Sequence, residues 1–207
     1  MCLMIHKPAG IEIPPDLIRA AAALNRDGWG LMGFDADRRV LLERQLKPDV
    51  PTLLNRLAAL RNAEYVLHLR RRTRGAADLR NVHPLKVVGG LHLMHNGTLG
   101  FRRREPGRSD SWQLAAAILR PLAQRHPSLL ADNAFHQLLE LGLRPENKLA
   151  LLDERTRRIV ILNRVHGAEF EGLWLSNTRW IDRAQLQLSA TPQPQERSYR
   201  AGELRFL

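Results

Sequence analysis

Met1-Cys2-Leu3-Met4-Ile5-His6 opens the chain and places its only cysteine directly before a short apolar segment. The length and apolar character of this segment predict a β-strand. A single cysteine excludes an intramolecular disulfide, and a lone cysteine is most often a small buried apolar residue. Position 2 changes this expectation. Methionine aminopeptidase removes Met1 when the next side chain is small, and this would leave a free α-amine and a thiol on Cys2.

An N-terminal cysteine can supply both a nucleophile and a base. A free thiol with a pKa of about 8.5 is only slightly ionised at neutral pH. An α-amine with a pKa of about 7.7–8.0 can take the thiol proton and later return it to a leaving amine. The oxyanion formed by attack on an amide needs fixed donors, worth roughly 3–4 kcal/mol each. Asn96-Gly97, at the end of a predicted strand, could provide a side-chain amide and a backbone N–H.

The rest of the chain predicts one layered domain. With 207 residues, of which 44% are hydrophobic, the chain can bury a substantial core. Short strands joined by short turns alternate with helices, which favours an α+β fold with mainly antiparallel sheets. The strands are predicted at residues 29–34, 40–46, 65–69, 91–95, 148–152, 159–162 and 173–176. The helices are predicted at residues 17–24, from residue 51 onward, 112–124 and 132–141. Residues 76–90 are predicted to form a loop, and residues 191–200 an irregular tail before a last short strand at 204–207.

The chain is strongly basic, with 32 Lys and Arg against 21 Asp and Glu and a formal net charge of +11. Such a surface favours an anionic partner, but a bias toward arginine in the composition explains the charge equally well. No segment approaches 18 consecutive apolar residues, so no membrane span is predicted. His6, Lys7 and Pro8 interrupt the N-terminal apolar segment, which argues against a signal peptide. We therefore expect a cytoplasmic location.

Beyond these patterns, the chain resembles the class II glutamine amidotransferases, which are N-terminal-nucleophile hydrolases. The motifs that carry the resemblance occur in the family's order: Met1-Cys2, Asp27-Gly28-Trp29-Gly30-Leu31, His68-Leu69-Arg70-Arg71-Arg72-Thr73-Arg74-Gly75, Asn81-Val82-His83-Pro84, His95-Asn96-Gly97-Thr98-Leu99 and Ser109-Asp110-Ser111. Residues 147–153 and 174–177 resemble the small stand-alone members of bacteria and phages. The resemblance implies an αββα sandwich of two stacked sheets flanked by helices. This domain would cover residues 2–180, with a C-terminal extension at 181–207.

The resemblance also implies a reaction. Cys2 attacks the side-chain amide of L-glutamine and becomes a γ-glutamyl thioester, while Asn96 and the Gly97 amide stabilise the oxyanion. The products are L-glutamate and ammonia, and no cofactor is expected. About 27 residues follow the matched region. This is too few for a synthase domain, so the ammonia would go to a separate synthase or acceptor protein.

Three further residues are implied to bind the two ends of the free amino acid. Arg70 pairs with the glutamine α-carboxylate, a bidentate match that lysine would make less well. Thr73 adds a hydrogen bond to the same carboxylate, and Asp110 receives the α-ammonium group. His68 precedes Arg70 on an apolar strand and is predicted to be a core histidine rather than a catalyst.

Arg71, Arg72 and Arg74 depart from the family pattern, because relatives commonly carry small, apolar or histidine residues there. These arginines either bind an anionic acceptor or partner, or they are simply solvated. Two alternative functions stay open at this point. The same fold could cleave another linear amide, or the arginine-rich segments at residues 70–74 and 102–108 could make the chain a nucleic-acid-binding module without catalysis.

Metal binding is not predicted. His83, His92 and His95 lie near one another in the sequence, but no second cysteine or obvious carboxylate pair completes a ligand set.

Overall fold

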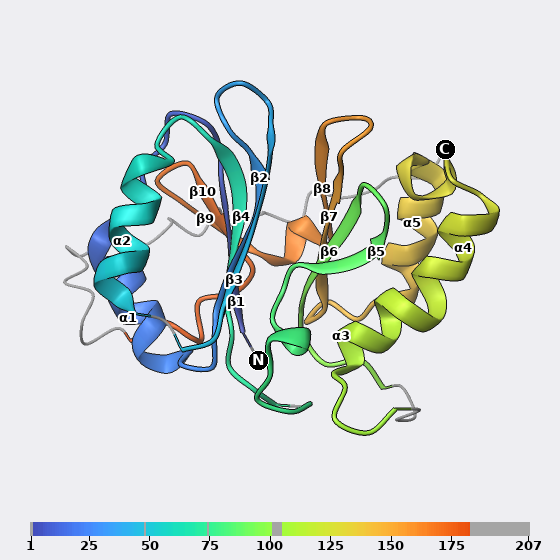
Figure 1. Ribbon diagram of the computed structural model, residues 1–207, viewed down its shortest axis with the longest axis horizontal. Helices are drawn as coiled ribbons and strands as arrows, with labels where there is room; N and C mark the ends of the chain where they lie inside the picture. Colours follow the sequence, from blue (N-terminus) through green and yellow to red (C-terminus); the bar gives the residue numbers. More distant parts are fainter. Residues whose placement is uncertain (1, 48, 74, 101–104, 183–207) are drawn as a thin grey trace, which may run out of the picture.

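The computed structural model of the protein describes residues 2–47, 49–73, 75–100 and 105–182. Two antiparallel sheets are stacked face to face between two layers of helices (Figure 1). This arrangement confirms the predicted α+β class and the αββα sandwich. The predicted irregular tail and the last strand at 204–207 lie outside the described residues.

The first sheet has six strands in the order β3-β2-β4-β1-β10-β9. Their bounds are β1 Leu3–Lys7, β2 Trp29–Phe34, β3 Val40–Gln45, β4 Glu64–Leu69, β9 Ala168–Phe170 and β10 Leu173–Leu175. The strand β1 is central, because Ile5 lies opposite Leu67 of β4 on one side and Leu175 of β10 on the other. Cys2 is therefore held at the end of a strand that is paired along both edges.

The second sheet has four strands in the order β5-β6-β7-β8. Their bounds are β5 Leu85–Val88, β6 Leu91–Asn96, β7 Lys148–Asp153 and β8 Arg158–Leu162. The prediction of a loop throughout residues 76–90 was wrong, because β5 forms there. This strand has only four residues and a register shift between Lys86 and Val88, so its alternation is too short to be recognised from sequence alone. The three-residue strand β9 was missed for the same reason.

Helices cover the outer face of each sheet, as Figure 1 shows. The first sheet carries α1 Pro15–Leu24 and α2 Val50–Ala59. The second carries α3 Asp110–Gln113, a π-helical segment η2 Leu114–Leu119, α4 Arg120–Arg125 and α5 Asn133–Gly142. Short 3-10 turns occur at η1 Leu79–Asn81, η3 Leu129–Ala131 and η4 Arg164–His166. The helix predicted at 112–124 is thus a longer helical run from Asp110 to Arg125 with a π segment inside it.

Three apolar layers hold the sandwich together. Because side chains alternate along a strand, Leu3 and Ile5 of β1 face α1 and α2, whereas Met4 faces the second sheet. The layer between the sheets consists of Met4, Met32, Phe34, Val66, Met94, Ala150, Leu152 and Trp174. A third cluster fills the space between the second sheet and its helices. The two sheets therefore have a fixed spacing, which matters because the predicted site residues come from both.

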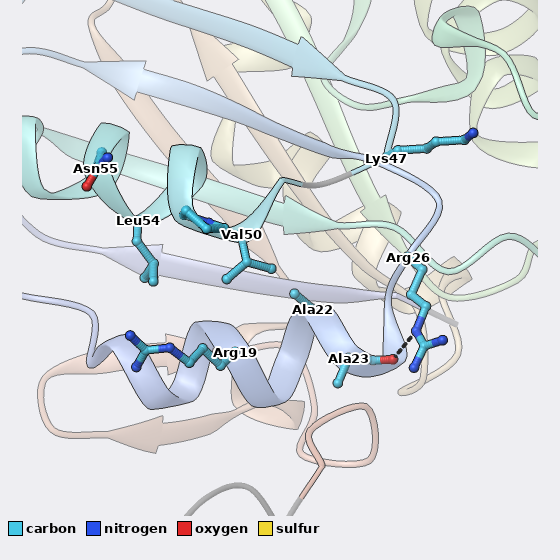
Figure 2. Close-up of a pocket in the computed structure, with 9 residues that line it drawn as sticks. Arg19, Ala22, Ala23, Arg26, Lys47, Val50, Leu54 and Asn55 are labelled. Carbon is cyan, nitrogen blue, oxygen red and sulfur yellow. Dashed lines mark hydrogen bonds between the residues drawn. The ribbon is translucent and has the colours of Figure 1, made fainter.

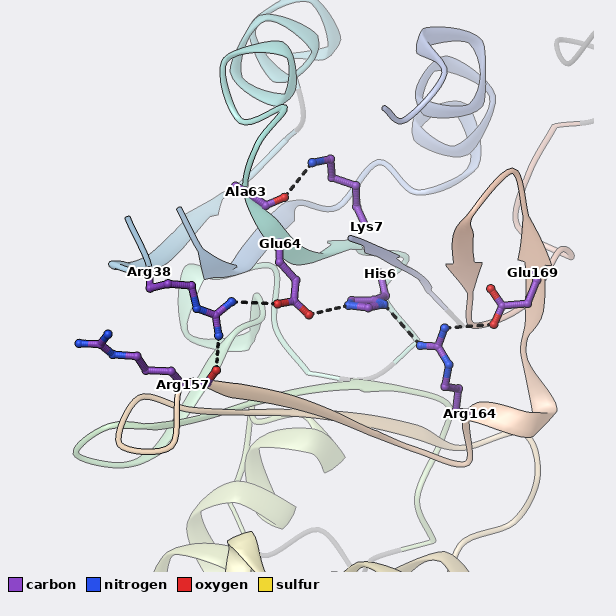
Figure 3. Close-up of polar contacts among 8 residues, drawn as sticks. All are labelled: His6, Lys7, Arg38, Ala63, Glu64, Arg157, Arg164 and Glu169. Atoms are coloured by element: carbon purple, nitrogen blue, oxygen red, sulfur yellow. Dashed lines mark hydrogen bonds and ion pairs between the residues drawn. The ribbon is translucent and has the colours of Figure 1, made fainter. Parts of the chain in front are cut away.

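A polar network joins the sheets at the end away from Cys2 (Figure 3). Glu64 of β4 accepts from His6 Nε2 at 3.3 Å and from Arg38 Nη1 at 3.1 Å. On its other side, His6 Nδ1 lies 3.4 Å from Arg164 Nη1, and Arg164 also pairs with Glu169 at 3.0 Å. A guanidinium can only donate, so His6 accepts at Nδ1 and donates from Nε2. This assigns the neutral tautomer, consistent with burial lowering the pKa of His6.

Candidate functional site

Three strand ends from the two sheets meet at one end of the sandwich. Cys2 precedes β1, Arg70 follows β4, and Asn96 is the last residue of β6. Figure 1 shows that β1 begins at this end of the sandwich. The antiparallel pairing of β1 with β4 brings Leu3 opposite Leu69, so the residues flanking this pair, Cys2 and Arg70, are neighbours. The residues predicted from separate motifs are thus placed together by the fold.

Every polar group of Cys2 has a partner from another part of the chain. Its backbone nitrogen donates to Asn96 Oδ1 at 3.1 Å, and its carbonyl accepts from Asn177 Nδ2 at 3.0 Å. The thiol lies between the backbone groups of Arg71, with Sγ 3.3 Å from both the carbonyl oxygen and the nitrogen. The side chain is only partly buried. The sulfur is therefore fixed in position while one side of the residue faces the solvent.

The surroundings of Cys2 favour the protonated thiol. Burial raises the pKa of the Cys2 thiol, and the hydrogen bond from the Arg71 N–H and the charge of Arg70 oppose this effect only in part. A thiol in this state needs a base before it can attack an amide. The nitrogen of Cys2 itself is the nearest candidate, because it becomes an α-amine when Met1 is absent.

Gly97 fits its position because it lacks a side chain. Its φ is +144°, and a Cβ atom would lie 2.2 Å from Asn147 Oδ1. Asn147 also accepts at the same oxygen from His95 Nε2 at 3.1 Å, and His95 Nδ1 lies 2.8 Å from Ser111 Oγ. The turn after β6 is therefore packed tightly against the start of β7 and of α3.

Arg70 is nearly fully buried, with 3% of its surface exposed. Its backbone nitrogen donates to Gly28 O at 2.8 Å, and its carbonyl accepts from Asp27 N at 3.0 Å. Its guanidinium donates to Ala76 O at 3.3 Å. The Asp27-Gly28 motif thus fixes the backbone on which Arg70 stands. Thr73, three residues later, is exposed in this segment.

Asp110 is the first residue of α3 and is 9% exposed. Its Oδ2 accepts from Leu99 N at 2.7 Å, and its Oδ1 accepts from Ser111 N at 3.0 Å. Ser109 is the N-cap of the helix and accepts from Trp112 N. The carboxylate therefore closes the loop that follows Asn96-Gly97, and each of its oxygens retains a further lone pair for a ligand.

Three buried histidines lie behind the site. The rings of His68 and His83 are 4.3 Å apart, and His95 completes the group. Burial lowers the pKa of His68 to about 3 and the pKa of His83 well below its usual value. Burial also lowers the pKa of His95, against an opposing effect of the nearby Asp110. Gly30 allows this packing, because a Cβ there would overlap His83 O. The prediction that His68 is a core residue is confirmed by its complete burial.

Several asparagines organise the site, although no role was predicted for them from the sequence. Asn81 donates to Ala76 O at 3.1 Å and to Gly107 O at 2.8 Å, and accepts from Ser109 N at 2.9 Å. It therefore ties the loop after Arg70 to the start of α3. Asn147 and Asn177 act similarly on Gly97 and Cys2. All three lie within motifs of the family resemblance, and that was the only available signal.

A hollow of about 920 Å³ lies elsewhere, between α1 and α2 (Figure 2). Ala22, Val50 and Leu54 line it together with the cationic residues Arg19, Arg26 and Lys47. Figure 2 shows these cations spread apart and not converging on one point.

No group of three or more potential metal-ligating side chains occurs among the described residues. In the same part of the chain, no helix is long and apolar enough to cross a membrane.

The sequence of residues 16–148 matches the family described as glutamine amidotransferases class-II, which is more than half of the chain. The chain belongs to this family. A search of curated proteins gives no significant match.

Among solved structures, this amidotransferase chain is similar to glutamine phosphoribosylpyrophosphate amidotransferase from B. subtilis, determined in complex with ADP and GMP. The identity is 14% and the TM-score 0.48, over 84% of the present chain. The chain spans 41% of the length of that protein. The family assignment rests on the sequence match alone.

Proposed function

We propose that the protein hydrolyses L-glutamine to L-glutamate and ammonia, with Cys2 as the nucleophile once Met1 has been removed. The observation that carries the proposal is the position of the Cys2 nitrogen, 3.1 Å from Asn96 Oδ1. In this arrangement one N–H of the amine is given to Asn96, while the nitrogen lone pair remains for the thiol proton. The raised pKa of the thiol makes such a base necessary.

The proposed reaction runs through two tetrahedral intermediates. The α-amine takes the proton from Sγ as the sulfur attacks the carboxamide carbon of glutamine. The C–N bond then breaks, the ammonium returns its proton to the leaving nitrogen, and ammonia departs from a γ-glutamyl thioester. Water attacks the thioester with the amine again as the base, which releases glutamate and restores the thiol. In both steps Asn96 Nδ2 and the Gly97 N–H would stabilise the oxyanion.

The proposed specificity rests on two buried opposite charges near Cys2. Arg70 would pair with the α-carboxylate and Asp110 with the α-ammonium, which selects a free amino acid over a peptide-bound side chain. Thr73 would add a hydrogen bond to the carboxylate after a local adjustment, because its side chain faces solvent. The ammonia would pass to a separate acceptor protein in the cytoplasm. Arg71 and Arg72 are exposed beside the thiol and could attract an anionic acceptor, whereas Arg74 and Arg102–Arg104 lie outside the described residues.

Mass spectrometry of the purified protein tests the nucleophile directly. The intact mass shows whether Met1 has been removed, and treatment with a diazoketone analogue of glutamine shows whether Cys2 is labelled. We expect full removal, one label per chain, and no label on a Cys2→Ala variant. Retention of Met1 in an active preparation would overturn the mechanism, because the nitrogen would then be an amide.

Two further measurements separate the alternative functions. A panel of glutamine, asparagine, N-acetylglutamine and simple acyl amides tests the substrate, and release of ammonia from an acyl amide alone would favour another amidohydrolase. Salt-dependent binding to DNA or RNA without glutamate release would favour the basic binding module.

A further inference from the structure

The hydroxyl of Ser176 lies behind the residues that hold the nucleophile. Ser176 follows β10, which pairs with β1, and it is completely buried. Its backbone nitrogen donates to Met4 O at 2.9 Å, and its Oγ accepts from Met4 N at 2.8 Å. The same Oγ lies 2.5 Å from Asn96 Nδ2. One hydroxyl thus joins the nucleophile strand to the side chain that contacts the Cys2 nitrogen.

A carboxamide can present either its oxygen or its NH2 group to a given neighbour, because a half-turn exchanges the two. Asn96 faces Cys2 N on one side and Ser176 Oγ on the other. The Met4 N–H is a donor that cannot change its role, and it occupies one lone pair of Ser176 Oγ. Asn96 Nδ2 donates to the same oxygen at 2.5 Å, and Asn177 Nδ2 lies 3.4 Å from it. In this orientation Asn96 Oδ1 faces the nitrogen of Cys2.

This orientation has a chemical consequence for the nucleophile. With Oδ1 toward the amine, Cys2 donates one N–H and keeps its lone pair for the thiol proton. The second N–H of Asn96 Nδ2 remains for the oxyanion. In the opposite orientation Asn96 Nδ2 would donate into the amine lone pair, and the base would be blocked.

We propose that Ser176 is a positioning residue that fixes the orientation of the Asn96 carboxamide and thereby keeps the Cys2 amine available as the base. This inference rests on the proposed function and adds a residue to it. Ser176 acts on the amine through Asn96, while its contacts with Met4 N and Asn177 Nδ2 hold the backbone around Cys2. Its removal should therefore matter much more while Asn96 is present than after Asn96 has been replaced.

A double-mutant cycle on Ser176 and Asn96 tests this dependence. Its readout is the rate at which iodoacetamide alkylates Cys2, the only cysteine of the chain. We expect Ser176→Ala to slow alkylation about tenfold, corresponding to the loss of one buried hydrogen bond. In an Asn96→Ala background the same change should alter the rate less than about twofold. An equal loss in both backgrounds would overturn the proposal. Ser128→Ala, at an exposed serine outside the site, is the control and should react like the wild type.

The steady-state kinetics of glutamine hydrolysis provide a second measurement on the same variants. Ser176→Ala should lower kcat about tenfold and change KM less than about threefold, because it leaves the substrate contacts intact. An accepting Oδ1 stabilises the ammonium form of Cys2, so its loss lowers the pKa of the amine. The acidic limb of the kcat/KM profile should therefore move to lower pH. An unshifted limb together with an unchanged kcat would overturn the proposal.

The alkylation rate does not require glutamine, so failure of the two proposals can be distinguished. A wild type that is alkylated rapidly but releases no glutamate would refute the proposed function. The role of Ser176 would then still be decided by the alkylation rates of the double-mutant cycle. If Ser176→Ala does not fold, NMR of the wild type gives a second test. The Asn96 Hδ2 protons, identified by their loss in Asn96→Ala, should show an Overhauser effect to the Ser176 Hβ protons. Its absence would show that the carboxamide is oriented the other way.

Discussion

The nitrogen of Cys2 and the side-chain oxygen of Asn96 are 3.1 Å apart, although 94 residues separate them in the sequence. The two residues belong to different sheets, and the apolar layer between the sheets sets their separation. Neither residue is held by the contact alone, because Asn177 holds the carbonyl of Cys2 and Ser176 holds the amide of Asn96. The site is therefore a property of the stacked sheets and not of one loop.

Replacing Asn96 by Ala removes the partner of the amine and one donor to the oxyanion. Loss of such a donor costs about 10²–10³ in kcat in other hydrolases. We expect a decrease of this size in glutamate release, with a much smaller change in KM. Asn55→Ala, at an exposed position of α2, is the matched control and should retain the wild-type kcat. A wild-type kcat in Asn96→Ala would remove Asn96 from the mechanism.

Gly97→Ala should reduce both stability and turnover. The added methyl would lie 2.2 Å from Asn147 Oδ1, and a φ of +144° is strained for alanine. Such strain costs about 1–3 kcal/mol, and relief of the clash would shift the Gly97 amide away from the oxyanion. Urea unfolding measures the first effect and glutamate release the second. Gly100→Ala is the control, because a Cβ there meets no atom within 4 Å. Equal stability of the two variants would contradict the prediction.

The six predicted site residues came from short motifs that follow one another in the order typical of the family. The order of these motifs identified the residues, because each motif alone also occurs in ordinary turns and helix caps. Cys2, Arg70 and Asn96 all lie at strand ends, where a period-two pattern stops. The orientation of Asn96 could not be predicted, because it depends on Ser176, 80 residues away. The role of Asn81 was hidden in the same way, since its partners come from three separate segments. Sequence patterns report local periodicity, and these hydrogen bonds are non-local.

Asp110→Asn tests recognition of the α-ammonium group. Asparagine keeps an oxygen that can accept from Leu99 N, so the loop after Gly97 should remain closed. The negative charge is lost, and a charge-assisted hydrogen bond contributes about 1.5–3 kcal/mol. We expect KM for glutamine to rise at least about tenfold, with a smaller effect on kcat. Asp132→Asn replaces an aspartate at the start of another helix, α5, and should leave KM unchanged. An unchanged KM in Asp110→Asn would assign the ammonium to another residue.

The buried histidines predict how stability depends on pH. Burial lowers the pKa of His68 to about 3, and it also lowers the pKa values of His83 and His95. In the unfolded chain a histidine has a pKa of about 6.5, so below this pH the unfolded state binds protons that the folded state does not. The free energy of unfolding should therefore be insensitive to these groups above about pH 7. It should fall as the pH decreases from 6.5 toward 3, by up to about 1.4 kcal/mol per pH unit for each histidine.

Urea unfolding between pH 7.5 and 4.5 measures this slope, and substitution of one histidine assigns it. His68→Gln should reduce the slope by close to one proton, because the new side chain does not titrate. His126→Gln, which replaces an exposed histidine outside this cluster, is the control. If His68→Gln is too unstable to measure at low pH, His83→Gln provides the same comparison, because its ring is packed against that of His68. Identical slopes in all variants would mean that these histidines are protonated in the folded protein, and the packing of the layer behind the site would then have to accommodate their charge.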